Sequence, residues 1–337
     1  QALAVDREEF AAGVTREIEA HPLITVVRGE VRKLPGDRPC VVATGPLTSD
    51  ALALDLVKIT GRAHLAFFDA IAPTIYADSI DHDVVWRATR YDKGGADYLN
   101  CPFTREEYDA FYDALVAAER FIPKHPDDTK YFESCLPIEV IAERSRKGPL
   151  FGPMKPVGLD DPRTGRWPHA VVQLRQENRE GTLWSLVGFQ TQLKRGEQER
   201  VFRMIPGLQN AEFARYGQVH RNTFIYSPSL LNATCQTRRD PRLFLAGQLI
   251  GVEGYIESAA SGWLAGVNAA RVLLGKEALE LPATTMLGAL CHYITHAELK
   301  DFQPMKANYG ILPPLAAPPK GKRERAAAYA QRALDDL

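Results

Sequence analysis

The stretch that most restricts the fold runs from Leu243 to Gly275 and reads "LFLAGQLIGVEGYIESAASGWLAGVNAARVLLG". Its first residues are short and apolar enough for a central strand of a parallel sheet, and a glycine-bearing turn leads into a long helix. Small residues keep this helix slim, so it can lie close to a sheet or a ligand. One of its faces is apolar and carries Ile256, Ala260, Trp263, Val267, Ala270 and Leu274.

The remaining segments alternate between helix and strand patterns, as in an α/β protein. Capping signals at Asp6 with Glu9 and at Thr104 with Glu107 each predict the start of a helix, the first ending near Ala20. Strand patterns are "LITVVRG", "PCVVATG", "AHLAFFDAIAPTIYADSI", "HAVVQLRQEN" and "GTLWSLVGFQTQL", with a polar turn around Asn178 to Gly181 between the last two, and "RGEQERVFRMIPGL" reads as a helix.

This order predicts two domains, one of them discontinuous. We expect residues 1–95 and 239–315 to form a nucleotide-binding domain of α/β type, with residues 96–238 inserted as an α+β domain. Residues 316–337 read as a proline-bearing linker and a charged helix.

Charge and cysteine content restrict the possible partners and compartment. The 41 Lys and Arg nearly cancel the 42 Asp and Glu, so any polyanion must meet a local patch. The 5 cysteines include no C-x-x-C pair, which favours a reducing, cytoplasmic compartment and argues against a disulfide framework or a zinc site. The cysteine pattern therefore leads us to expect no metal. No apolar run approaches the roughly 18 residues of a membrane span, so we expect no membrane partner either.

The turn before the long helix is a candidate ligand site. Gly247, Gly251 and Gly254 permit unusual backbone angles and close approach, and the helix start offers free N–H groups and a positive dipole end. Thr44 and Gly45 end another buried strand, and ligands sit at such strand ends in open α/β sheets. The alternative is that the glycines only allow the chain to turn and bind no ligand.

Several stretches together resemble one family. "VVATG" and "LFLAGQLIGVEGYIESAASGWLAG" look like the flavin-binding domain of the folate- and FAD-dependent tRNA uracil-5 methyltransferases, the TrmFO family, which is related to MnmG. Stretches that select TrmFO are "DYLNCPFT", "FESCLPIEV", "LFGPMKPVGL", "AVVQLRQEN", "WSLVGFQT", "MIPGL", "RYGQVHRNTF" and "FQPMKANYGILPP". The resemblance implies a Rossmann-like FAD-binding domain of glutathione-reductase type.

The sequence departs from the family at its start. The family begins with a Gly-x-Gly-x-x-Gly turn that holds the FAD pyrophosphate and continues through a second functional cysteine, and neither occurs here. We therefore expect an N-terminally incomplete chain that lacks the first βαβ unit of the domain and binds FAD poorly by itself.

The chemistry that the resemblance implies is methylation of RNA. FAD, reduced by NAD(P)H, would carry a one-carbon unit from 5,10-methylenetetrahydrofolate to C5 of a uridine in the T arm of tRNA, giving 5-methyluridine. Uracil C5 is a poor nucleophile, and a thiolate that adds to C6 activates it.

The family motif "FESCLPIE" implies a catalytic role for Cys135. Glu133 and Glu139 beside it would raise the thiol pKa, so a cation should lie nearby, and Lys155 in "FGPMKPVG" is the candidate. The alternative for a lone cysteine is a small buried hydrophobe, and that is our expectation for Cys101.

Other candidates carry two interpretations each. Val252, Glu253 and Tyr255 belong to the predicted FAD-binding turn, with Tyr255 either at the flavin edge or a core aromatic. His220 either stacks on the pterin of folate or is structural. Gln173, Arg175 and Glu177 line a cleft or a solvated surface.

Four short basic clusters are either solvated surface or, together, a track for RNA phosphates. They lie at Arg144 to Lys147, Lys194 to Arg195, Arg238 to Arg239 and "KGKRER". Two other functions remain open, namely another FAD-dependent oxidoreductase or MnmG-like tRNA modifier, and an inactive RNA-binding fragment. Flavin absorbance separates the last from the others.

Overall fold

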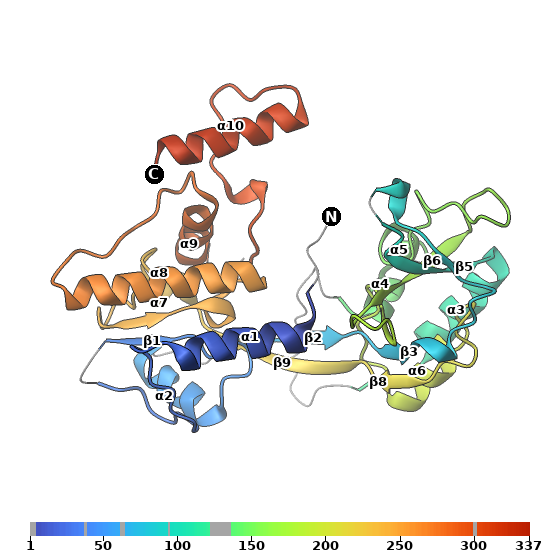
Figure 1. The fold of residues 1–337 in the computed structure, drawn as a ribbon, viewed down its shortest axis with the longest axis horizontal. Helices are drawn as coiled ribbons and strands as arrows, with labels where there is room; N and C mark the ends of the chain where they lie inside the picture. Colours follow the sequence, from blue (N-terminus) through green and yellow to red (C-terminus); the bar gives the residue numbers. More distant parts are fainter. Residues whose placement is uncertain (1–4, 37–38, 61–64, 94, 122–135, 299–301) are drawn as a thin grey trace. The chain divides into compact units, whose positions relative to one another are not determined.

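The computed structural model describes residues 5–36, 39–60, 65–93, 95–121, 136–298 and 302–337. The chain forms two compact units (Figure 1). Unit 1 comprises Gln1–Arg28 and Phe68–His220, and unit 2 comprises Gly29–Phe67 and Arg221–Leu337. Two strands, β2 (Leu65–Ile71) and β9 (Gln218–Phe224), pair with each other and contain two of the unit limits.

Unit 1 is built around a six-stranded antiparallel sheet with the order β4-β5-β6-β7-β3-β8. The pairing of β5 with β6 is the longest, from Tyr98 opposite Arg175 to Phe103 opposite Ala170. The elements are α1 (Arg7–Ala20), β3 (Thr74–Tyr76), η1 (Ala77–Ser79), β4 (Trp86–Arg87), η2 (Arg90–Asp92), β5 (Tyr98–Phe103), α3 (Arg105–Ala117), α4 (Ile138–Arg144), α5 (Gly148–Phe151), β6 (Ala170–Gln176), β7 (Leu183–Leu186), α6 (Arg195–Phe202) and β8 (Phe213–Arg215).

The core of unit 1 contains a row of phenylalanines. The ring centroids of Phe103 and Phe111 lie 5.4 Å apart, those of Phe111 and Phe189 6.3 Å apart, and those of Phe189 and Phe202 5.7 Å apart. All four side chains are buried, and they come from β5, α3, the segment after β7, and α6. Aromatic packing therefore holds α3 and α6 on the sheet.

Unit 2 has the parallel strand pair predicted for a nucleotide-binding domain. β1 (Cys40–Val42) pairs with β10 (Leu243–Leu245) in parallel, and the long helix α8 (Tyr255–Leu273) packs on both strands (Figure 1). The other elements are α2 (Asp50–Thr60), α7 (Ser227–Leu230), η5 (Gly247–Ile250), α9 (Met286–His296), η6 (Tyr309–Ile311) and α10 (Lys322–Asp335).

The local capping predictions are confirmed. The Asp6 carboxylate accepts from the N–H groups of Glu8 and Glu9 at the start of α1, and Thr104 with Glu107 forms a full capping box on α3. β6 and β7 are the predicted hairpin around Asn178 to Gly181.

Two strand predictions differ from the structure. "LITVVRG" is wrong as a strand, because residues 23–29 contain no strand and Leu23 and Val27 are strongly exposed. The "AHLAFFDAIAPTIYADSI" segment is two strands instead of one, since the break between β2 and β3 contains Pro73, which cannot donate to a sheet ladder.

The compact units and the predicted domains have different limits. β3 and β4 precede residue 95 yet pair in the same sheet as β5 to β8, and residues 221–238 belong to unit 2. The limits at residues 95, 238 and 315 remain a prediction about independently folding domains.

Candidate functional site

The carboxyl ends of β1 and β10 lie together in unit 2. The N–H of Ala246 donates to the carbonyl of Val42 at 3.0 Å, so the residues that follow the two parallel strands emerge at one edge. Thr44 is tied to Thr48 by a hydroxyl contact of 2.6 Å, and Gly45 has a φ of 73°. A Cβ built on Gly45 would meet no atom within 4 Å, so open space lies beside this turn.

Three glycines shape the turn between β10 and α8. Gly247, Gly251 and Gly254 have φ values of 74°, 84° and 105°, which other residues rarely adopt. The N–H of Gly247 donates to the buried Oγ of Ser261 at 2.9 Å. A Cβ on Gly251 would lie 2.7 Å from Cζ of Phe302, so this position also requires a residue without a side chain.

The turn is fixed from the other side by Met305. The N–H of Met305 donates to the carbonyl of Gly251, and the N–H of Glu253 donates to the carbonyl of Met305, both at 2.9 Å. Val252 between them is fully buried, and Gln248 Nε2 donates to Glu253 Oε2 at 3.1 Å. The predicted cofactor residues Val252 and Glu253 therefore hold the turn's shape, whatever else they contact.

The start of α8 is open to solvent. Its N-cap is Gly254, which supplies no side-chain hydrogen bond to the first N–H groups of the helix. Tyr255 is 97% exposed in the described part of the structure, so its ring does not belong to the core. Unsatisfied N–H groups, a positive dipole end and an exposed ring suit a flat ligand with carbonyl oxygens.

Most of the apolar face predicted for α8 is exposed, with only Ala260 and Val267 half-buried. Ile256 is 80% exposed and Trp263 56% exposed, while the buried residues are Ser261, Leu264, Ala265 and Asn268. Asn268 explains the difference, because its buried amide donates to the carbonyls of Thr234 and Leu279 and so turns a polar position inward.

These observations fit a flavin at the turn. The carboxyl ends of β1 and β10, the three glycines and the uncapped start of α8 lie together in unit 2. A flavin site formed by Thr44, Gly45 and Gly247 to Tyr255 needs this arrangement. The individual contacts of these residues with FAD remain a prediction.

Cys135 lies outside the described residues, whereas its neighbour Glu139 is well defined in α4. The Glu139 carboxylate is fully buried and accepts from the Gln192 N–H at 2.6 Å and from Thr191 Oγ1 at 3.0 Å. Burial raises the pKa of this carboxyl, and the hydrogen bonds oppose that shift only partly. Glu139 therefore anchors α4, the helix that follows the "FESC" motif.

Lys155 lies in unit 1 with an exposed side chain and no ion pair to a described carboxylate. Its segment is held by Arg90, whose guanidinium donates to the carbonyls of Lys155 and Val157 at 2.7 Å each. Burial lowers the pKa of Arg90. The backbone of Lys155 is thus fixed while its ammonium group is left free.

Sequence reasoning missed the segment that supports Lys155. Tyr91 and Asp92 have φ values of 58° and 50°, and the left-handed conformation costs about 1–2 kcal/mol per residue. The Tyr91 N–H donates to the Gly158 carbonyl at 2.9 Å, and its ring lies where a Gly158 side chain would be. Tandem left-handed residues other than glycine have no sequence signature, so only the structure reveals this support.

His220 lies in β9, and its side chain is outside the described part of the structure. Its role toward folate remains a prediction. Of the three strand residues considered with it, Gln173 is buried and donates to Asn100 at 3.0 Å, while Arg175 is exposed and pairs with Glu177 at 3.2 Å. The strand therefore does not present the three as one cleft wall.

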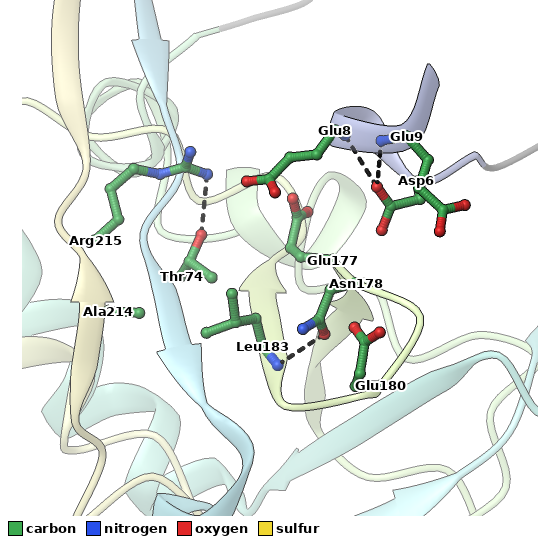
Figure 2. A pocket seen from close by; sticks show the side chains of 10 residues that line it. All are labelled: Asp6, Glu8, Glu9, Thr74, Glu177, Asn178, Glu180, Leu183, Ala214 and Arg215. Atoms are coloured by element: carbon green, nitrogen blue, oxygen red, sulfur yellow. Dashed lines mark hydrogen bonds between the residues drawn. The ribbon is translucent and has the colours of Figure 1, made fainter. Parts of the chain in front are cut away.

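Glu177 lines a different feature, a cavity of about 390 Å³ in unit 1 (Figure 2). Arg215 donates to Thr74 there at 3.0 Å, and its buried Nε has no hydrogen-bond partner among the described residues. Five carboxylates also line the cavity, from Asp6, Glu8, Glu9, Glu177 and Glu180. Their charge disfavours RNA phosphate at this place.

The described cysteines other than Cys40 are buried. Burial raises the pKa of the Cys101 thiol, which packs in the core of unit 1. A hydrogen bond to Cys291, together with burial, raises the pKa of the Cys235 thiol. High pKa values keep the Cys101 and Cys235 thiols protonated and unreactive.

In most of the predicted basic clusters, cations form ion pairs or hydrogen bonds with other residues of the chain. Arg146 contacts Asp109 and Asp113, Lys194 pairs with Glu119 at 2.6 Å, and Arg239 donates to the Ile59 carbonyl at 2.9 Å. No helix among the described residues is long and apolar enough to cross a membrane. The described part of the chain also contains no group of three or more His, Cys, Asp or Glu suited to a metal ion.

Comparison with known proteins places this geometry in a family context. The family described as Glucose inhibited division protein A matches residues 1–277. The chain is 57% identical over 336 residues to the methylenetetrahydrofolate–tRNA-(uracil-5-)-methyltransferase TrmFO of Heliobacterium modesticaldum, a match that covers 100% of this chain and 76% of that protein. The TrmFO of Geobacter sulfurreducens is 58% identical over 337 residues, covering 100% and 77%.

A solved structure supports the fold. Aquifex aeolicus GidA, in its form II crystal, superposes with a TM-score of 0.65 at 17% identity, over 86% of this chain and 52% of the GidA chain. The chain thus spans about half the length of GidA. This likeness confirms the predicted Rossmann-type α/β fold class.

Proposed function

Because the chain belongs to the TrmFO family, we propose that it is a methyltransferase that moves a one-carbon unit from 5,10-methylenetetrahydrofolate to C5 of a uridine in tRNA. FAD is its cofactor, and 5-methyluridine is the product. Identity of 57% along the whole chain to a methyltransferase of this kind carries the proposal.

Finer features of the reaction belong to the same proposal. The target is a uridine of the T arm, the reductant is NAD(P)H, and the reaction takes place in the cytoplasm. Support for the compartment comes from Cys101, Cys235 and Cys291, which are thiols and not disulfides in the described part of the structure.

The turn of unit 2 is proposed to hold the flavin ring. The open N–H groups at the start of α8 would hold its pyrimidine oxygens, and Tyr255, Thr44 and Gly45 would contact the ring. The reduced flavin, when bound, supplies the electrons that convert the transferred carbon into a methyl group. A helix start favours the charge that the pyrimidine side gains on reduction.

Cys135 is proposed as the nucleophile. Its thiolate adds to C6 of uracil, which makes C5 reactive. Lys155 is proposed to favour the thiolate, because it is the exposed, unpaired ammonium on a segment that Arg90 fixes. His220 is proposed to stack on the pterin ring of folate.

The experiment that tests the function follows labelled carbon. Purified protein with added FAD, NADPH and labelled methylenetetrahydrofolate should label an unmodified tRNA transcript, and mass spectrometry should place the methyl group on a T-arm uridine. Cys135→Ala should remove the label while flavin absorbance is kept. Cys101→Ala is the matched control, since it deletes a buried thiol of the core.

The role of Lys155 has its own measurement. Lys155→Met should raise the apparent pKa in the pH–rate profile, whereas Lys147→Met, an exposed lysine nearby in the sequence, should not. Full activity of Cys135→Ala would refute the nucleophile, and label on a base other than uridine would refute the substrate.

A further inference from the structure

The residues that open α10 form the densest group of cations on the chain. Lys320, Lys322, Arg323 and Arg325 lie within six residues, and Glu324 is the only acid among them. The match to the Glucose inhibited division protein A family ends at residue 277, whereas the match to TrmFO relatives covers the whole chain. The group therefore belongs to a part shared with those relatives.

Three of these cations have free, exposed head groups. Lys320, Lys322 and Arg323 are exposed, and none of them belongs to an ion pair among the described residues. Arg325 differs from them, because its guanidinium donates to the carbonyls of Pro319 and Lys320 at 3.1 and 3.4 Å. It ties the loop that carries Lys320 to the start of α10, which carries Lys322 and Arg323.

The helix behind this group is fixed within unit 2. Arg332 donates to the carbonyls of Pro314 and Pro313 at 3.0 and 2.8 Å, and the rings of Tyr329 and Tyr309 lie 5.5 Å apart. The cations are therefore presented from an ordered element, unlike those of a disordered basic tail.

Helix stability does not explain these cations. Lys322 and Arg323 occupy the first two positions of α10, where the helix dipole favours acids and disfavours cations. The N-cap, Gly321, gives no side-chain hydrogen bond, and Glu324 is the only acid in the first turn. The charges repel one another and the helix end, and a polyanion would relieve both repulsions.

We propose that Lys320, Lys322 and Arg323 form a docking surface for the phosphate backbone of the tRNA substrate, an inference that rests on the proposed function. Exposed lysine and arginine head groups suit backbone contacts, which position RNA without reading its sequence. The surface adds affinity and takes no part in the chemistry.

The test removes the three charges and keeps the helix. The variant Lys320→Gln, Lys322→Gln, Arg323→Gln should bind an unmodified tRNA transcript about ten- to hundredfold more weakly in fluorescence anisotropy at low salt. The slope of log affinity against log salt should fall by about 2–3, from roughly 0.7–0.9 for each lost contact. The circular dichroism spectrum should not change.

The matched control removes three other exposed lysines of unit 2, Lys33→Gln, Lys58→Gln and Lys276→Gln. The control variant has the same net charge as the test variant but keeps the three cations of the proposed surface. It should therefore bind like the wild type. Equal loss in the two triple variants would mean that net charge alone matters and would overturn the proposal.

Two further outcomes have different meanings. Wild-type affinity and salt slope in the test variant would overturn the docking surface but leave the methyltransferase function intact. A test variant that binds tRNA normally but phosphatidylserine vesicles weakly would have the same meaning. A wild-type protein that fails to bind the tRNA transcript would overturn the proposed function, and the docking surface with it.

Discussion

Gly251 offers a direct test of why the turn before α8 is built from glycine. Its φ of 84° costs an L-residue about 1–2 kcal/mol, and a Cβ there would lie 2.7 Å from Cζ of Phe302. Phe302 is buried and packs near Phe224, Tyr226 and Tyr293, so its ring cannot move without disturbing the core of unit 2. Such overpacking costs about 1–3 kcal/mol.

Gly251→Ala should therefore destabilise unit 2 by about 2–5 kcal/mol, which corresponds to a fall in Tm of roughly 5–15 °C for a unit of this size. Thermal unfolding followed by circular dichroism measures the shift. Gly262→Ala is the control, since a Cβ at that α8 position meets nothing within 4 Å and helix propensity favours alanine by about 1 kcal/mol.

A double variant separates the two costs of Gly251→Ala. Phe302→Leu removes the ring end, so adding it to Gly251→Ala should recover the steric part and leave the backbone strain. The reasoning is refuted if Gly251→Ala melts with the wild type, or if the two substitutions add without coupling.

Two further predictions concern buried polar groups. Burial raises the folded-state pKa of Glu139 above its unfolded value, so its stabilising effect is complete below the unfolded pKa and is lost as pH rises through the folded pKa. In guanidinium unfolding at a series of pH values rising from 4.5, the ordinary pKa of this carboxyl, the wild type should lose stability relative to Glu139→Gln, and parallel pH dependences would contradict this. Asn268→Ala leaves the carbonyls of Thr234 and Leu279 without their donor and should lower the unfolding free energy by about 2–4 kcal/mol; a loss below about 0.5 kcal/mol would show that water replaces the amide.

Local signals in the sequence predicted local structure well. The caps at Asp6 and Thr104 and the β6–β7 hairpin depend on residues close together in the chain, and all three form as expected. The strand pair β1–β10 was also predictable, because two apolar runs that end in Thr-Gly or Ala-Gly suit a parallel sheet.

Features that depend on individual side-chain contacts between distant residues were not predictable. The buried face of α8 follows Asn268, whose partners Thr234 and Leu279 belong to two other segments, and periodicity alone cannot anticipate that. The fixed backbone of Lys155 depends on Arg90, 65 residues earlier. Sequence motifs therefore predict which segments form the candidate site, whereas the contacts that shape it are seen only in the tertiary structure.

The exposed apolar face of α8, a stripe that includes Ile256 and Trp263, has a practical consequence for spectroscopy. Trp263 lies on it at 56% exposure, and Trp184 of unit 1 is buried. Trp167 of unit 1 is 53% exposed, so the measurement uses a Trp167→Phe background. Any molecule that covers the stripe must take the Trp263 indole out of water, which shifts its emission to shorter wavelength and shields it from iodide quenching. The helix thus contains its own optical reporter, and titrations can follow coverage of this face without an added dye.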